Sequence, residues 1–161
     1  MLKERLYGIA HDARSTYWKV AKPVRHGVKV ALLSPADELL VVRHSYGTQR
    51  WSLPGGGYKP RREPAEFAAL REVHEELANV QVPFLYQIGI EVSTREIKRD
   101  VVAFYGGRFA VEGAGPACKS PELSDVQLTP FADIHERPDE FSWTVHAAVR
   151  MFEEANRLRE I

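Results

Sequence analysis

The sequence has one cysteine, no excess of either charge and no long apolar run. Cys118 has no second cysteine with which to form a disulfide bond, and one thiolate cannot supply a metal cluster. The 22 basic and 22 acidic residues give a formal net charge of zero. Dedicated nucleic-acid-binding domains are usually strongly basic, so this balance argues against a nucleic-acid partner. No segment approaches the roughly 20 apolar residues that a membrane-spanning helix needs, so no membrane partner is expected.

The chain also lacks repeats, low-complexity tracts and a linker long enough to divide it. Its 161 residues suit one domain with a sizeable core. Apolar residues recur at helical spacing between Leu2 and Ala13, which predicts a helical extension over residues 1–22, packed on a main domain of residues 23–161. Charged residues interrupt this first segment, so it does not have the apolar core of a signal peptide, and a cytoplasmic location is expected.

Apolar and β-branched runs separated by turn residues predict both strands and helices. The expected strands cover residues 24–33, 39–43, 51–53, 84–92, 101–105, 108–111 and 126–129. The expected helices cover residues 64–78 and 141–159. Their inward-facing residues are Phe67, Leu70, Val73 and Leu77 in the first helix and Val145, Val149, Phe152 and Ala155 in the second. Periodicity alone therefore indicates a fold that combines helices and strands.

Three glutamates crowd one face of the first expected helix. Glu72, Glu75 and Glu76 stand at positions i, i+3 and i+4, which are neighbours on a helix surface. Like charges there repel by roughly 0.2–0.5 kcal/mol per pair, and a chain with balanced charge need not place them together. A hard divalent cation such as Mg²⁺ binds carboxylates together with substrate phosphates and would offset this repulsion. The alternative is an acidic helix face that contacts only water.

The residues around this acidic face follow a fixed spacing along the chain. The positions that match it are Gly57, Glu63, Arg71, Glu72, Val73, Glu75 and Glu76. In this register the chain resembles the Nudix hydrolases, whose signature is Gly, five residues, Glu, seven residues, Arg-Glu, an aliphatic residue, any residue, Glu-Glu, any residue, Gly and an aliphatic residue. At about 6–7% usage per residue type, six fixed residues match by chance on the order of once in ten million start positions.

The last two positions of the signature depart from the family pattern. Ala78 and Asn79 stand where the family has glycine and an aliphatic residue. A helix often ends with a left-handed residue, which is usually glycine and sometimes asparagine. We therefore expect Asn79 to end the helix, with Val80 as the aliphatic residue and with the spacing of the carboxylates unchanged.

The resemblance implies both a fold and a reaction. The implied fold is a Nudix-type α/β/α sandwich around a mixed β-sheet, here with an extra N-terminal helix. The implied enzyme is a pyrophosphohydrolase that uses water to cleave a diphosphate bond in a nucleoside triphosphate or in a nucleoside diphosphate linked to another group, X. The implied cofactor is Mg²⁺ or Mn²⁺, held by Glu72, Glu75 and Glu76. Either Glu72 or Glu75 would also act as the base.

Other residues in and around the signature are expected to support this site. Arg71 and Glu63 would form a catalytic pair, because a guanidinium group holds a carboxylate in place, and an ordinary surface ion pair is the alternative. The backbone of Gly56 would contact the metal, although the surrounding glycine run also suits a tight connection between strand and helix. Glu122, in a later loop, is the candidate for a further metal ligand, with a solvent-exposed glutamate as the alternative.

The substrate is expected to be a small, free nucleotide derivative. The candidate substrate-binding residues are His44, Tyr46, Arg50, Gly55 and Gly57. Aromatic side chains stack on bases and cations hold phosphates, although Trp51 in the same segment suits the core equally well. The alternative substrate is RNA. The residues that would bind RNA in place of a small nucleotide form a basic patch of Lys19, Lys22, Arg25, Arg61 and Arg62.

Two other functions and one assembly stay open at this stage. The first alternative is a catalytically silent Nudix-fold protein that binds a nucleotide or a partner. The second is an interaction domain whose motif arose by accident. The complete set of Arg71 and the three glutamates argues against a silent protein, which has no need of it. A homodimer is compatible with the sequence.

Overall fold

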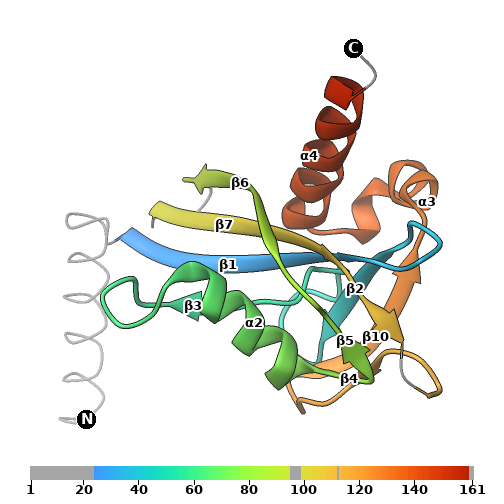
Figure 1. The fold of residues 1–161 in the computed structure, drawn as a ribbon, viewed down its shortest axis with the longest axis horizontal. Coiled ribbons are helices and arrows are strands. Elements are labelled where there is room, and N and C mark those ends of the chain that lie inside the picture. Colours follow the sequence, from blue (N-terminus) through green and yellow to red (C-terminus); the bar gives the residue numbers. More distant parts are fainter. Residues whose placement is uncertain (1–23, 95–98, 112, 160–161) are drawn as a thin grey trace, which may run out of the picture.

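A mixed sheet forms the centre of the molecule, whose computed structural model describes residues 24–94, 99–111 and 113–159 (Figure 1). The strands lie in the order β10-β2-β1-β7-β6, and a short β3 pairs with β1. Their bounds are β1 Val24–Leu33, β2 Leu39–His44, β3 Gly57–Tyr58, β6 Tyr86–Ser93, β7 Arg99–Arg108 and β10 Leu123–Thr129. β1 and β7 run parallel, whereas the other neighbours pair antiparallel, so the sheet is mixed as expected.

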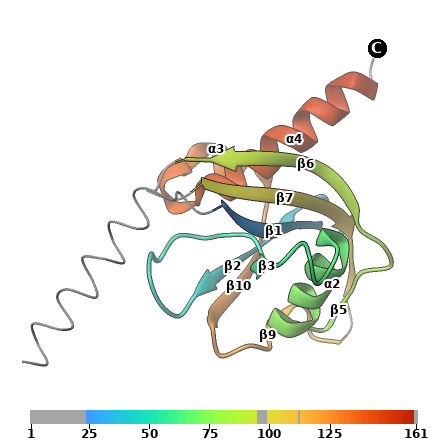
Figure 2. The same cartoon turned by 90° about the vertical axis from the view of Figure 1, so that its left-hand side faces the viewer.

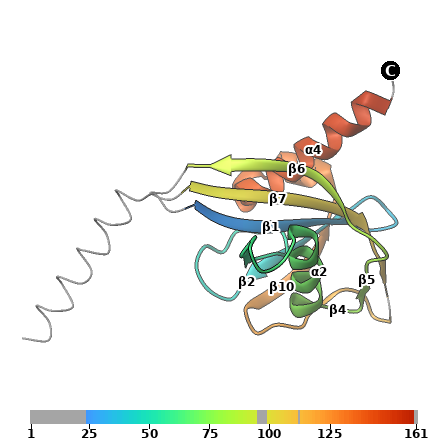
Figure 3. The same ribbon diagram turned by 60° about the vertical axis from the view of Figure 1, so that its left-hand side comes forward.

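Helices cover both faces of this sheet. They are α2 (Ala65–Glu76), α3 (Phe131–Glu136), the 3-10 helix η1 (Pro138–Glu140) and α4 (Trp143–Arg159). Figures 2 and 3 show α2 on one face of the sheet and α3 and α4 on the other. This arrangement is the α/β/α sandwich that the resemblance implied. None of the described helices is both long and apolar enough to cross a membrane.

The two faces of the sheet have separate cores, because successive side chains of a strand point to opposite faces. The core under α2 includes Val28, Val30, Leu32, Ala68, Ala69 and Val73. The core under α4 includes Ala31, Val41, Phe104, Val145 and Val149. Both cores draw on β1, so this central strand fixes where the helices lie. The residues of the signature that lie on α2 are thereby anchored to the sheet.

Two residues that were expected to face the core are exposed. Phe67 of α2 is 64% exposed, whereas its neighbours Ala68 and Ala69 are fully buried. Small side chains let a helix lie close to the sheet, and that close approach turns Phe67 outward. Ala155 of α4 is also exposed, because the C-terminal end of this helix extends away from the sheet (Figure 1).

The end of α2 differs from the expectation by two residues. The helix ends at Glu76, and Leu77–Ala78 forms strand β4, which pairs with β9 (Ala117–Cys118). Asn79 has the expected left-handed conformation, with φ of 60°, but it follows β4 and does not end the helix. A strand pairing between residues about 40 positions apart ended the helix early, and local sequence carries no sign of it.

Several other elements differ from those that the sequence predicts. Of residues 108–111, only Arg108 belongs to the central sheet, because Ala110–Val111 (β8) pairs with Val80–Gln81 (β5). Trp51 and Ser52 form only isolated bridges. The short α3 was not expected at all. The predicted helical extension over residues 1–22 lies outside the described residues.

Candidate active site

The glycine loop, residues 53–57, runs beside β1 and supplies the floor of the site. The amide of Val28 donates to the carbonyl of Gly56 at 2.9 Å, and the amide of Val30 donates to Pro54 at 2.9 Å. Gly55 has a φ of +131°, and a Cβ on it would lie 2.2 Å from the carbonyl oxygen of Val28. Only glycine fits there, since both the backbone angle and the close approach exclude a side chain.

Glu76 is the buried member of the three glutamates. Its residue is 6% exposed, and its Oε2 accepts a hydrogen bond from the amide of Gly55 at 3.0 Å. Burial raises the pKa of Glu76 to about 7, although the Gly55 hydrogen bond and the charge of Lys29 act in the opposite direction. Burial therefore makes this carboxyl group costly to ionise even beside Lys29.

Lys29 of β1 is a component of the site that the sequence analysis missed. Its Nζ donates to the carbonyls of Leu53 at 2.9 Å and Gly55 at 3.1 Å, so it holds the glycine loop in place. Burial lowers the pKa of Lys29, while the charges of Glu76 and Glu72 act to raise it. One signal was available, because Lys29 interrupts an apolar strand between Val28 and Val30, and a lysine there needs polar partners.

Arg71 binds the carboxylates around it, as expected for its pairing with Glu63. Its Nε and Nη2 donate to the two oxygens of Glu63 at 3.3 and 2.9 Å. Its Nη1 donates to Glu72 at 2.7 Å and to Glu75 at 3.2 Å. These contacts, with the Glu63 hydrogen bonds first, raise the pKa of Arg71 above its ordinary value. One guanidinium group therefore orients three carboxylates.

Glu72 lies between Arg71 and the glycine loop. Its side chain is 12% exposed, whereas that of Glu75 is 59% exposed. A Cβ on Gly56 would lie 2.7 Å from Oε1 of Glu72. The absence of a side chain at Gly56 therefore lets the Glu72 carboxylate lie directly against the loop.

The three glutamates share one helix face but do not converge on one point. Within residues 24–94, 99–111 and 113–159, no group of three histidine, cysteine, aspartate or glutamate side chains has the arrangement of a metal site. Arg71 holds Glu72 and Glu75, and Glu76 is turned toward the amide of Gly55. Because all the donors are oxygen atoms, the set suits a hard cation such as Mg²⁺ in its chemistry.

A second group of predicted residues gathers at the end of β2. The Ser45 hydroxyl donates to the carbonyl of Pro121 at 3.0 Å, which ties the two loops together. The Tyr46 hydroxyl donates to Oε2 of Glu122 at 3.4 Å, and the rings of His44 and Tyr46 are 5.7 Å apart. The amide of Lys119, in the same loop as Glu122, donates to the carbonyl of Glu76 at 2.9 Å, so this loop lies against the end of α2.

The environments of these residues shift their acidities in different directions. Burial is the main cause that lowers the pKa of His44, and the charge of Lys29 adds to it. The charge of Glu122 is the main cause that raises the pKa of Tyr46. His44 therefore favours its neutral form, which is a hydrogen-bonding group and not a cation.

The remaining candidates, Arg50 and Trp51, are not part of this gathering. Trp51 is 5% exposed and belongs to the core under α4, with the guanidinium carbon of Arg43 4.1 Å from its ring centroid. Arg50 is exposed and makes no ion pair with any residue in the described part of the chain. Gly57 is exposed and pairs with Gly27 through β3.

A hollow of about 210 Å³ lies beside the glycine loop. Its lining includes Lys29, Gly55, Gly56 and Asp100. Since Gly55 and Gly56 contact Glu76 and Glu72, this hollow opens next to the acidic face of α2.

Comparison with known proteins identifies the family. The model of the NUDIX domain matches residues 23–151 of the chain. The chain belongs to the Nudix hydrolase family.

Solved Nudix structures share the fold of this Nudix hydrolase. The NUDIX domain of NrtR from Shewanella oneidensis, complexed with ADP ribose, has a TM-score of 0.67 at 23% identity, covering 83% of this chain and 89% of that chain. A MutT NUDIX hydrolase from Burkholderia pseudomallei has a TM-score of 0.67 at 20% identity, covering 80% of this chain and 98% of that chain. At these identities the likeness concerns the fold.

A curated relative matches a short part of the Nudix hydrolase. Diphosphoinositol polyphosphate phosphohydrolase 3-alpha of Mus musculus is 52% identical over 40 residues, which are 25% of this chain and 24% of the mouse protein. The match thus spans about a quarter of the length of that relative.

Proposed function

We propose that this Nudix hydrolase uses a divalent metal ion and water to cleave a diphosphate bond in a nucleoside diphosphate linked to another group, X, or in a nucleoside triphosphate. The observation that carries the proposal is the arrangement of Arg71, which orients Glu63, Glu72 and Glu75 beside a glycine loop that binds Glu76. A surface salt bridge would not need a buried carboxylate and, next to it, a glycine that no other residue can replace.

The oxygen atoms of Glu72, Glu75 and Glu76 would hold Mg²⁺ or Mn²⁺, with the carbonyl of Gly56 and the carboxylate of Glu122 as further ligands. The donor set fits a hard cation, because all of these groups would bind it through oxygen atoms. When bound, such an ion neutralises phosphate charge and lowers the pKa of water.

The protein side chains have distinct parts in the reaction. A carboxylate oxygen of Glu72 or Glu75 accepts a proton from the attacking water as the new P–O bond forms and the bond to the leaving phosphate breaks. Arg71, paired with Glu63, keeps these carboxylates in position. Lys29 holds the glycine loop through the carbonyls of Leu53 and Gly55. The side chains of His44 and Tyr46, with Arg50 and the backbone of Gly55 and Gly57, would contact the substrate.

A second candidate substrate is a diphosphoinositol polyphosphate. It is favoured by the relative of that name, which is 52% identical over 40 residues. The bond to be cleaved is again a diphosphate, so the chemistry proposed for Glu72, Glu75 and Glu76 is unchanged. Only the group that carries the diphosphate differs.

The deciding experiment is a panel of substrates assayed with Mg²⁺ and with Mn²⁺. It contains nucleoside triphosphates, nucleoside diphosphate derivatives and a diphosphoinositol polyphosphate, with product identification and Glu75→Gln as the matched control protein. We expect metal-dependent cleavage of a diphosphate bond that the variant loses. Tight nucleotide binding without turnover would instead identify a silent, nucleotide-binding member of the family.

A further inference from the structure

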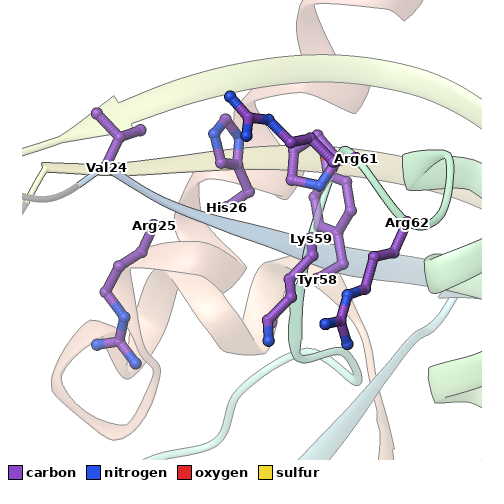
Figure 4. Close-up of a pocket in the computed structure, with 9 residues that line it drawn as sticks. Val24, Arg25, His26, Tyr58, Lys59, Arg61 and Arg62 are labelled. Carbon is purple, nitrogen blue, oxygen red and sulfur yellow. The ribbon is translucent and has the colours of Figure 1, made fainter.

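A large pocket lies at the N-terminal end of β1, away from the turn that connects β1 to β2. Its volume is about 650 Å³, which is in the range of small-molecule sites. Its lining residues come from β1, from β3 and from the loop that leads into α2: Val24, Arg25, His26, Gly57, Tyr58, Lys59, Pro60, Arg61 and Arg62. We call it the basic pocket (Figure 4).

The charge of this pocket has one sign. Arg25, Lys59, Arg61 and Arg62 line it, and no acidic residue does. None of the four makes an ion pair with another residue in the described ranges. In Figure 4 the cationic ends of Arg25, Lys59 and Arg62 extend in the same direction. A chain with zero net charge has gathered four like charges around one cavity, and they repel one another unless an anion lies between them.

The basic pocket adjoins the active site. It shares Arg25, His26 and Gly57 with the hollow of about 210 Å³ that is lined by Gly55 and Gly56. A molecule that fills the pocket would therefore extend into the hollow beside the glycine loop, where the amide of Gly55 donates to Glu76. The residues after Arg62 strengthen the connection, because Glu63 is the bidentate partner of Arg71.

The chemistry of the lining selects phosphates over a nucleobase. Guanidinium groups bind phosphate oxygens in pairs, and an ammonium group adds a point charge. The only aromatic rings among the lining residues are His26 and Tyr58, which contact each other edge to face with centroids 5.9 Å apart. These two rings do not form a site in which a nucleobase would stack. Four cationic side chains can instead bind several phosphate groups.

We propose that the basic pocket is the subsite for the non-reacting part of the substrate, and that this part is a compact group bearing several phosphates. The proposal rests on the proposed function, because it assumes that the diphosphate lies beside α2. It assigns substrate recognition to Arg25, Lys59, Arg61 and Arg62, the last three of which occupy variable positions of the Nudix signature. The residues that cleave the diphosphate bond and the residues that bind the rest of the substrate would then be separate sets.

The test measures binding without turnover, so it stays informative if the proposed reaction is wrong. Calorimetric titrations in EDTA at physiological salt would use inositol hexakisphosphate, linear inorganic tripolyphosphate and AMP. The pocket variant is K59Q/R61Q/R62Q. The control is R137Q/R150Q/R157Q, which removes the same charge from the residue that follows α3 and from two positions of α4. Melting curves would show that both variants are folded, and the single variant Arg25→Gln replaces the triple if it is not.

We expect wild type to bind inositol hexakisphosphate at least tenfold tighter than AMP, and the pocket variant to lose at least tenfold while the control changes less than threefold. If linear tripolyphosphate also binds at least tenfold tighter than AMP, the ligand of the pocket is a polyphosphate chain. Equal losses in both variants, or no loss in either, would overturn the proposal. So would displacement of the hexakisphosphate by 5′-triphosphorylated RNA at lower concentration, because the pocket would then serve RNA.

With a substrate that the enzyme cleaves, the same variants separate recognition from chemistry. We expect KM to rise at least tenfold in K59Q/R61Q/R62Q while kcat stays within about threefold, because the lost charges contact the part of the substrate that does not react. A fall in kcat with unchanged KM would place these residues in the chemical step and overturn their assignment.

Discussion

The acidic face of α2 and the basic pocket lie next to each other and treat charge in opposite ways. On the acidic face every carboxylate has a partner: Arg71 contacts Glu63, Glu72 and Glu75, and Glu76 accepts a hydrogen bond from Gly55. In the basic pocket, four cations have no carboxylate among the lining residues. A composition with no net charge therefore conceals a strong local separation of charge.

This difference has a physical meaning for binding. Paired charges hold a geometry in place, since each is fixed by hydrogen bonds with defined directions. Unpaired charges exert a field that attracts a ligand of opposite sign. The acidic face is thus suited to positioning reacting groups, and the basic pocket to capturing an anionic substrate.

Removing the metal should have the largest effect on the acidic face. We expect hydrolysis to disappear in excess EDTA and to return with added Mg²⁺ or Mn²⁺, because carboxylates alone repel a phosphate anion. Initial rates with and without chelator are the measurement. Undiminished turnover in EDTA would show that the acidic face does not act through a cation.

Neutralising one carboxylate at a time should come next in size. We expect Glu75→Gln and Glu76→Gln each to lower kcat by on the order of a hundredfold while the protein stays folded, since the shape is kept and the charge is lost. Glu66→Gln, on the first turn of the same helix, is a suitable control. Wild-type kcat in both site variants would show that neither carboxylate takes part in the reaction.

The buried carboxylate should also make stability depend on pH. The pKa of Glu76 is about 7 in the folded protein, above its ordinary value of 4.5, because burial disfavours the charge. Below pH 4.5 the contribution of Glu76 to stability is fully present. This contribution is lost as the pH rises through 7, because the folded protein binds the proton of Glu76 more tightly than the unfolded chain does and gives it up at that pH.

Melting temperatures of metal-free wild type and Glu76→Gln between pH 5 and 8 test this linkage. We expect wild type to lose stability relative to the variant as the pH rises, and added Mg²⁺ to narrow the difference at high pH. Parallel curves for the two proteins would contradict the assigned pKa. The comparison with the variant removes the contributions of histidines, which both proteins share.

The smallest effect concerns the exit from the acidic helix. Asn79 has a φ of 60°, and its side chain donates to the carbonyl of Gly115 at 3.1 Å. We expect Asn79→Val to destabilise the protein by about 1 kcal/mol, because a branched side chain resists left-handed angles, and Asn79→Gly to be close to neutral. Chemical denaturation of both variants is the measurement. Equal stability of the valine variant would show that the segment relaxes to another conformation.

Much of this protein followed from local patterns in the sequence. The range of β1 and the existence of α2 and α4 came from apolar periodicity, which acts over a few residues. The spacing of Arg71 and the three glutamates was sufficient to indicate the family. Asn79 was recognised as a left-handed residue because its side chain tolerates that conformation, although the helix that it was expected to end stops at Glu76.

Other features depended on contacts between distant parts of the chain. The end of α2 was decided by the pairing of Leu77–Ala78 with Ala117–Cys118, and the exposure of Phe67 by how closely the helix packs on the sheet. The role of Lys29 required the glycine loop to lie beside β1. None of these can be read from a local window, because each partner lies at least two dozen residues away or on another layer.

The sequence by itself determined which residue types stand at which spacing on α2, and hence the family and the kind of chemistry to look for. Only the tertiary structure decided that Glu76 is buried while Glu75 is exposed, and that Arg25 of β1 joins Lys59, Arg61 and Arg62 around one cavity. The physical reason is that burial and electric field depend on distances in space, and the chain sets those distances only when its strands and helices pack.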